Sequence, residues 1–279
     1  MGQAKLKQQD AFARNLIEEW ESRDCIDFAV ALARRTGWLL HVDWWSTSSQ
    51  RPSEDCKESN FYPLRVYVAD NADKIFDPRG VMSIFDFAER IVRRQVRERG
   101  FNSGGVLTRF YAEDRFAELP LRYQPDEQMV SQALAEIEGH RSFLARIPSR
   151  NPSGIAAHHA ARLSFGSCAV FAEAMREHAG LQPTALLATR FLPGWEGTQI
   201  SKRGYFHSVV LHSDGAGEDA WGKAPLSDIA SRYGVAEFVT SEEEHRTVIQ
   251  RLKQTTPDVY ATRYSEALSL IQEHTDRYE

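Results

Sequence analysis

Three residues of the sequence have the types and the order that thiol-based acyl transfer requires: Cys168, His207 and Asp219. A cysteine attacks a carbonyl carbon as its thiolate, so it needs a neighbouring base that takes the thiol proton. Histidine can be that base, and a carboxylate beside it fixes its tautomer and orientation. The sequence therefore predicts a catalytic triad with Cys168 as nucleophile, His207 as base and then acid, and Asp219 as the group that orients the histidine.

Local patterns place each of these residues on a different element. Cys168 begins "CAVFAEAMREHAG", whose apolar residues have helical spacing, and the N-terminus of a helix lowers a thiol pKa and binds a developing oxyanion. The segment "YFHSVVLHS" alternates as a strand does, which predicts His207 at the beginning of that strand. "GEDAWG" predicts a short neighbouring strand that carries Asp219.

An earlier part of the chain repeats this pattern. "CIDFAVALARRTG" (25–37) shares Cys, Phe, two Ala and Gly with "CAVFAEAMREHAG" (168–180) at equal spacing. "DPRGVMSIFDFAER" (77–90) shares Asp, Gly, Asp, Ala and Arg with "DAWGKAPLSDIASR" (219–232). The two blocks follow each other at separations that differ by a single residue, so the sequence predicts a tandem duplication.

Each copy predicts the same α+β unit, a helix followed by three antiparallel strands and a second helix. The glycines that end the first helices, Gly37 and Gly180, suit C-terminal caps. Ser241 and Glu244 have the spacing of a capping box. We expect four regions: a degenerate unit (1–97), a helical linker region (98–152), a catalytic unit (153–240) and C-terminal helices (241–279).

The motifs "GSCAVFAEAM", "YFHSVVL" and "EDAWG" of the second copy resemble the core of the papain-like superfamily. Within it, the likeness is to compact transglutaminase-like members and to bacterial effector or toxin members of the deamidase type. It covers about residues 164–235, with a weaker likeness over 22–92. Trp221 also fits a D-x-W pattern found in some of these proteins.

The resemblance implies two tandem papain-like units and cysteine-dependent acyl transfer on an amide of a protein substrate. Glutamine deamidation is favoured narrowly over proteolysis, and transglutamination stays open. Papain itself has a glutamine ahead of the nucleophile, whereas this chain has Arg162 there. The second oxyanion donor is therefore undefined, with Asn151 as a candidate.

The first copy is expected to be noncatalytic. Alignment on Asp77 puts Arg65 where His207 stands, and an arginine cannot accept a proton in a protein. Cys25 is then interpreted as a small buried residue, with His41 as a less favoured alternative base. Should both copies be inactive, the protein is a papain-like pseudoenzyme that acts as a protein-binding module.

Other charged residues have a structural interpretation. Asp86 with Arg90, and Asp228 with Arg232, are spaced as pairs on a helix surface. Four histidines show no metal-ligand spacing, and we expect neither a metal nor a cofactor; they are His158, His159, His178 and His212.

Composition limits the function classes. The 279 residues carry a formal net charge of −5, which gives no reason to expect nucleic acid or an anionic membrane as partner. The three cysteines form no C-x-x-C motif, which argues against a disulfide framework and a structural zinc site. The N-terminal residues lack the apolar run of a Sec signal, so we expect a cytoplasmic protein, or one delivered into another cell by a non-Sec secretion route. The oligomeric state stays open.

Overall fold

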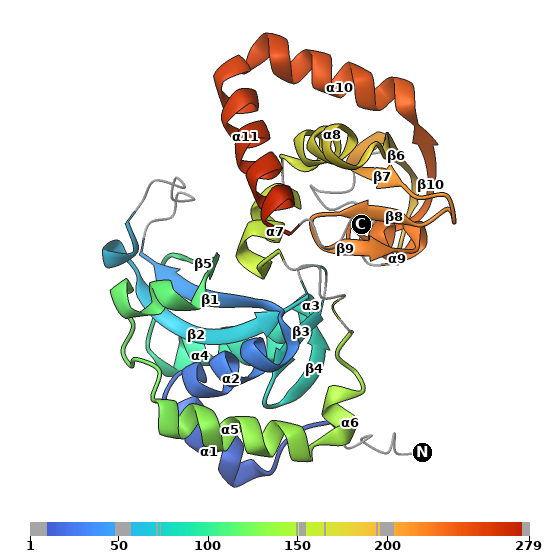
Figure 1. Ribbon diagram of the computed structural model, residues 1–279. Helices are drawn as coiled ribbons and strands as arrows, with labels where there is room; N and C mark the ends of the chain where they lie inside the picture. The colour runs from blue at the N-terminus through green and yellow to red at the C-terminus, as the bar shows by residue number, and fades with distance from the viewer. Residues whose placement is uncertain are drawn as a thin grey trace. The chain divides into compact units, whose positions relative to one another are not determined.

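The chain forms two compact units, residues 1–149 and 150–279, which are drawn from blue to red in Figure 1. The computed structural model describes residues 10–47, 57–70, 72, 74–148, 150, 155–164, 166–193, 195 and 204–274. Each unit has one five-stranded antiparallel sheet with helices packed against it, so the expected α+β class is confirmed.

The first unit is built around helix α2 and a sheet with the strand order β4-β3-β2-β1-β5. Its helices are α1 (Arg14–Ser22), α2 (Ile26–Thr36), α3 (Ile84–Phe87), α4 (Arg93–Glu98), α5 (Glu127–Gly139) and α6 (Arg141–Leu144). Its strands are β1 (Leu39–Ser46), β2 (Tyr62–Ala69), β3 (Lys74–Asp77), β4 (Gly80–Ser83) and β5 (Gly105–Tyr111). A π-helical turn (Ala88–Val92) joins α3 to α4, and two short 3-10 helices complete the unit (Glu58–Asn60 and Glu113–Glu118).

The segment expected to be a linker region belongs to this first unit. Strand β5 pairs with β1 along its whole length, and α5 packs against α2. Strand β1 pairs with β2 on one edge, and the backbone N–H and C=O groups of its other edge also require partners. Strand β5 supplies them.

The second unit is built around helix α8 and a sheet with the strand order β10-β6-β7-β8-β9. Its helices are α7 (Ala157–Ser164), α8 (Cys168–Ala179), α9 (Leu226–Ser231), α10 (Glu242–Thr255) and α11 (Pro257–Glu273). Its strands are β6 (Gln182–Phe191), β7 (Gly204–Leu211), β8 (Gly217–Asp219), β9 (Gly222–Ala224) and β10 (Val235–Ser241). Figure 1 shows α8 against the sheet, and α10 and α11 pack on α8 as well.

The two sheets have the same topology. Strands β1 to β5 occur in the same order as β6 to β10, and in each unit two helices precede the first strand, the second of them α2 or α8. Those helices, α2 and α8, both end at a glycine in the left-handed conformation, Gly37 (φ 70°) and Gly180 (φ 67°), which confirms the predicted caps. Each sheet contains two strands more than the three expected in each copy. One completes a hairpin (β4 or β9), and the other lies on the opposite edge of the sheet (β5 or β10).

The two sheets also share an irregularity. On β2, Arg65 pairs with Asp43 and Pro63 with the next residue of β1, so Leu64 is an extra residue. On β7, His207 pairs with Leu186 and Tyr205 with the next residue of β6, so Phe206 is the extra residue. A β-bulge re-aims the side chains around it. The shared bulge shows that Arg65 occupies the strand position that His207 occupies in the second unit.

Apolar packing fixes helix α8 on several sides. It buries Phe171 and Met175, and Ala169 contacts Val248 and Ile249 of α10. Helix α10 starts at Ser241, whose hydroxyl accepts the N–H of Glu244 at 3.1 Å, so this half of the predicted capping box is confirmed. Among the helices of the described residues, none is long and apolar enough to cross a bilayer.

Candidate active site

The Cys168 thiol lies at the start of α8, where only 6% of the residue is exposed. Its Sγ lies 3.3 Å from the Tyr205 hydroxyl. The first N–H groups of a helix have no intrahelical acceptor, and among the described residues no hydrogen bond uses the N–H of Cys168. The helix start thus presents a thiol and a free donor together.

His207 and Asp219 form a buried pair. His207 Nε2 lies 2.9 Å from Asp219 Oδ2, and the two side chains are 0% and 2% exposed. The other carboxylate oxygen, Oδ1, accepts the N–H of Trp221 at 2.9 Å, which fixes the carboxylate. His207 lies inside β7 rather than at its beginning as the sequence predicted, because the strand already starts at Gly204.

Charge and burial act against each other on the thiol. Burial alone would raise the pKa of Cys168, but the charge of His207 and hydrogen bonds from His207, Tyr205 and Ser208 outweigh it and lower that pKa. Burial would lower the pKa of His207, but the negative charge of Cys168 and the bond to Asp219 raise it to about 9. The two shifts favour a thiolate beside an imidazolium.

The imidazole has one nitrogen left for the thiol. With Nε2 bound to Asp219, Nδ1 is buried and makes no well-formed hydrogen bond within the described residues. The interaction with Cys168 therefore is looser than a full hydrogen bond, as catalytic contacts often are without substrate. Nδ1 is thus the imidazole nitrogen that Asp219 leaves without a partner among the described residues.

Two residues of this site were missed by sequence reasoning. Arg232 was interpreted as a surface partner of Asp228, but its Nη1 lies 3.4 Å from Asp219 Oδ1. The Tyr233 hydroxyl lies 3.4 Å from His207 Nε2, and its ring lies 4.5 Å from the imidazole. The helix ends at Ser231, so both side chains leave the helical surface and turn toward the site.

A cavity of about 370 Å³ opens beside Cys168. Its wall is mostly apolar and aromatic, with one cationic side chain; it includes Phe191, Phe206, Tyr233, Val248, Leu252 and Arg251. Consecutive strand residues normally point to opposite faces, and the bulge at Phe206 lets both Tyr205 and Phe206 line it. The thiol is therefore reached from a pocket that fits a side chain or a peptide segment.

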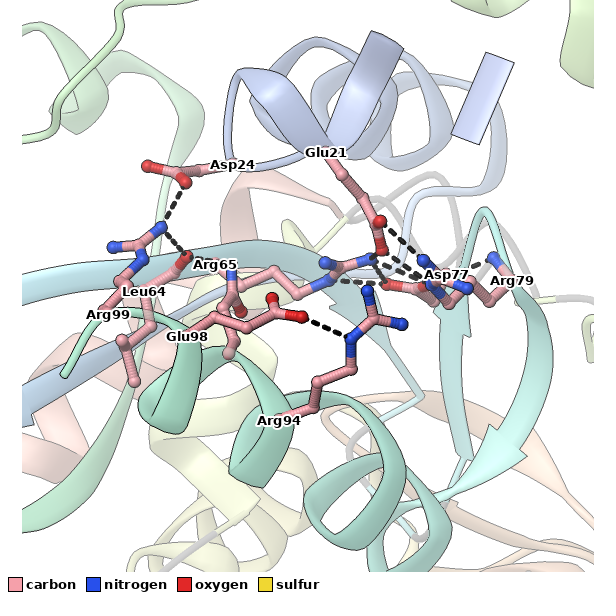
Figure 2. A network of polar contacts seen from close by, with 10 residues as sticks. Glu21, Asp24, Leu64, Arg65, Asp77, Arg79, Arg94, Glu98 and Arg99 are labelled. Carbon is pink, nitrogen blue, oxygen red and sulfur yellow. Dashed lines mark hydrogen bonds and ion pairs between the residues drawn. The ribbon is translucent and has the colours of Figure 1, made fainter. Parts of the chain in front are cut away.

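The corresponding place in the first unit holds a salt-bridge network (Figure 2). Arg65 is 2% exposed, and its Nε and Nη2 donate to the two oxygens of Asp77 at 2.8 and 3.1 Å. Its Nη2 also donates to Glu21 at 3.0 Å, and Glu21 accepts two bonds of 2.6 Å from Arg79. Asp77 corresponds to Asp219, and its partner has become a cation without a lone pair to accept a proton.

The pKa of the Cys25 thiol is shifted in the opposite direction to that of Cys168. Burial raises its pKa well above the ordinary value, and the charges of Asp77 and Glu21 add to this against the opposing charge of Arg65. Its N–H donates to the Trp20 carbonyl at 2.8 Å, so the donor that is free at Cys168 is occupied here. Cys25 therefore has neither a base nor a free helix-start donor.

The alternative base of the first unit, His41, does not reach that thiol. It lies on β1, where its ring stacks on Tyr67 with centroids 5.3 Å apart. Burial lowers its pKa to about 4, and neither ring nitrogen has a hydrogen-bond partner within the described part of the chain. His41 is thus a neutral packing residue.

One further candidate lies outside the described residues, and three of the other histidines make contacts of their own. Asn151, the candidate oxyanion donor, lies outside the described residues. His212 pairs with Glu218 at 2.7 Å, and the rings of His158 and His159 lie 4.0 Å apart. In the ranges that the structure describes, no group of three or more His, Cys, Asp or Glu residues is placed to hold a metal ion.

Comparisons with protein-family models, with curated proteins and with solved structures found no match to this chain. The geometry of the site is therefore the basis for assigning a function.

Proposed function

We propose that the second unit catalyses thiol-dependent acyl transfer on an amide of a protein substrate. The observation that carries the proposal is the buried arrangement of Cys168, His207 and Asp219, with the pKa of the thiol lowered and that of the imidazole raised. Burial by itself would shift both values the other way, so the arrangement offsets a considerable desolvation cost. Perturbed groups beside a cavity are the signature of a reactive site.

The proposed reaction assigns one role to each of these groups. His207 Nδ1 takes the thiol proton, Sγ bonds to the amide carbon, and the helix-start N–H groups, including that of Cys168, stabilise the oxyanion. The imidazolium then gives its proton to the nitrogen as the C–N bond breaks. Water, activated by the same imidazole, attacks the thioester, which releases a carboxylic acid and restores the thiol. With a glutamine side chain as substrate the released group is ammonia, and with a peptide bond it is an amine.

Among these reactions we favour glutamine deamidation over proteolysis, on the sequence likeness to deamidase-type effectors and toxins of the papain-like superfamily. The apolar cavity with Arg251 at its wall fits an amide presented between apolar neighbours. We also propose that the protein acts on its substrate in the cytoplasm, or in another cell that it enters by a non-Sec secretion route. No cofactor is needed for the steps above.

The alternative is a binding module without activity. The first unit favours such a role for itself, because Arg65 replaces the base and is held in salt bridges with Asp77 and Glu21. The second unit shows no such replacement. We therefore propose one catalytic and one noncatalytic unit.

The test is the alkylation of the intact chain by iodoacetamide as a function of pH, with each cysteine followed by mass spectrometry. Cys168 should react well below the pH at which ordinary thiols react, because its pKa is lowered, and Cys25 should stay slow because its pKa is raised. His207→Ala should remove the difference. A Cys168 that titrates as an ordinary thiol in the wild-type protein would overturn the proposal.

Substrate turnover gives a second readout. Incubation with candidate proteins should produce a mass gain of about 1 Da for each deamidated glutamine, as expected for hydrolysis of a side-chain amide. Cys168→Ala should reduce this by several powers of ten, the usual cost of removing a nucleophile, whereas Cys25→Ala should leave it unchanged. Activity that survives Cys168→Ala and not Cys25→Ala would move the active site to the first unit.

A further inference from the structure

A buried chain of polar side chains leads from the Cys168 thiol into the second unit. The Tyr205 hydroxyl lies 3.3 Å from Cys168 Sγ and 3.1 Å from Ser208 Oγ. Ser208 Oγ lies 3.1 Å from His245 Nδ1, and His245 Nε2 lies 3.0 Å from Glu173 Oε1. Each contact is within hydrogen-bond range, so the thiol, two hydroxyls, an imidazole and a carboxylate are connected without a break.

Three elements of the unit contribute to this chain. Cys168 and Glu173 lie on α8, Tyr205 and Ser208 on β7, and His245 on α10. Ser208, His245 and Glu173 are 1%, 2% and 7% exposed. Burying polar groups is costly unless each finds a partner, and Tyr205, Ser208 and His245 each have one on both sides. Such a network fixes the position of its members.

The two ends fix the first and last hydrogen bonds, and the bonds between them all run toward the thiol when both nitrogens of His245 carry a proton. Burial raises the pKa of Glu173, but the hydrogen bond from His245 and the charge of Arg176 outweigh burial and lower it, so this end is an ionised acceptor. A thiolate at Cys168 carries no proton, so the Tyr205 hydroxyl must be the donor in the contact with Sγ. Ser208 lies between Tyr205 and His245 and holds the hydroxyl oxygen at that place.

The noncatalytic unit lacks this pair of hydroxyls. By strand register, Pro63 corresponds to Tyr205 and Val66 corresponds to Ser208. The unit that has Arg65 in place of the base thus also has two side chains that cannot donate to a thiolate. The hydroxyl pair accompanies the triad and is absent where the triad is incomplete.

We propose that Tyr205 is a catalytic residue whose hydroxyl donates a hydrogen bond to the Cys168 thiolate, and that Ser208, His245 and Glu173 are positioning residues that hold this hydroxyl. The inference rests on the proposed function, since it concerns the same thiol. His207 supplies the charge on one side of the sulfur, and Tyr205 supplies a neutral donor on the other. The donor stays in place when the imidazolium gives its proton to the leaving group.

The experiment compares the pH profile of Cys168 alkylation by iodoacetamide in the full chain and in variants. Tyr205→Phe should raise the pKa of Cys168 by about one to two units, which is the size of a hydrogen bond to an ionised group. Ser208→Ala should shift it in the same direction by less, because Tyr205 remains but is no longer held. Tyr264→Phe is the matched control, since its hydroxyl contacts Glu177 on the same helix α8, and its profile should not change.

The outcomes separate this inference from the proposed function. An unshifted pKa in both Tyr205→Phe and Ser208→Ala, with a shift in His207→Ala, overturns the role of the hydroxyl chain and leaves the triad standing. An ordinary thiol pKa for Cys168 in the wild-type protein overturns the proposed function itself. A loss of folding in Tyr205→Phe, seen by circular dichroism, leaves Ser208→Ala to decide, and an unshifted profile there also overturns the inference.

Discussion

At the two cysteines of the duplicated units, burial and charge have opposite outcomes. Burial raises the pKa of both thiols, and at Cys168 the positive charge of His207 together with hydrogen bonding from Tyr205 reverses its effect. At Cys25 the cation is Arg65, but the carboxylates that neutralise it, Asp77 and Glu21, also act on the thiol and disfavour a thiolate. The residue at one strand position, His207 or Arg65, thus contributes to the opposite pKa shifts of the two buried thiols.

A buried carboxyl group on β1 allows a prediction about stability. Burial raises the pKa of Asp43 from 3.8 to about 6, against the opposing hydrogen bonds from Thr108 and Tyr67. The folded protein therefore holds this proton more tightly than the unfolded chain, and the stabilisation present below 3.8 is lost as the pH rises through 6.

Asp43→Asn should accordingly stabilise the first unit at about pH 8, by up to about 3 kcal/mol, because the neutral amide keeps an acceptor and carries no charge to bury. At about pH 4 the two proteins should differ little, because the wild-type carboxyl is protonated there. Urea unfolding at the two pH values gives the comparison. An equal difference in unfolding free energy at both pH values would mean that side-chain geometry, not charge, causes the stabilisation.

At the level of elements, a β-hairpin turn follows Asp219 in the second unit and Asp77 in the first, and it positions the aspartate side chain. Asp219 pairs with Gly222 across the β8–β9 turn, and Asp77 pairs with Gly80 across β3–β4. Both glycines have a positive φ, 116° and 113°, which a side chain adopts only with strain. The duplicated hairpin therefore offers a matched pair of substitutions.

Gly222→Ala and Gly80→Ala should each cost about 1–3 kcal/mol of unfolding free energy in their own unit, since the backbone strain is the same. Only Gly222→Ala should also slow the alkylation of Cys168, because it displaces Asp219 and with it His207. Unfolding curves and alkylation rates measured on both variants test this. Equal slowing by both would show that the effect does not pass through Asp219.

The Arg65 network has a structural role that joins elements of the first unit. Arg65 on β2 binds Asp77 on β3 and Glu21 on α1. Arg65→Met should destabilise the unit by about 3–5 kcal/mol, because it leaves a buried carboxylate unpaired. The double variant with Asp77→Asn should recover part of this loss in urea unfolding. A double variant as unstable as the single one would place the cost in packing rather than in charge.

At the level of the whole molecule, each of the two units packs around its own sheet. The triad, the cavity beside it and the hydroxyl chain all lie within residues 150–279, which form one of the two units. The first unit contains its own sheet and its own apolar cluster around Leu64, Tyr67 and Phe87.

A fragment of residues 150–279 should therefore fold and alkylate at Cys168 with the same pH profile as the full chain. Circular dichroism establishes folding, and mass spectrometry follows the reaction. A folded fragment with an ordinary Cys168 thiol would show that the first unit completes the site, whereas loss of turnover with unchanged alkylation would assign substrate recognition to the first unit.

Much of the fold could be predicted because local signals agree with the tertiary structure. Apolar periodicity and terminal glycines predicted α2 and α8. The equal spacing of the two blocks showed that Arg65 of the first copy corresponds to His207 of the second. The edge strands β5 and β10 were missed, since a strand on an edge has a weaker apolar pattern and follows a break in the repeat. The position of His207 within β7 was wrong because the strand already begins at Gly204, and glycine has a low strand propensity.

The sequence by itself determined which residue types recur in the two copies, and so which thiol has a histidine and which an arginine. The tertiary structure decided the protonation state and the partners of those residues. Whether Cys168 is a thiolate depends on burial, on His207, and on a hydroxyl fixed by His245 from α10. Arg232 likewise serves Asp219 rather than its helix neighbour. Charge and desolvation depend on distances between residues far apart in the chain, and only folding sets those distances.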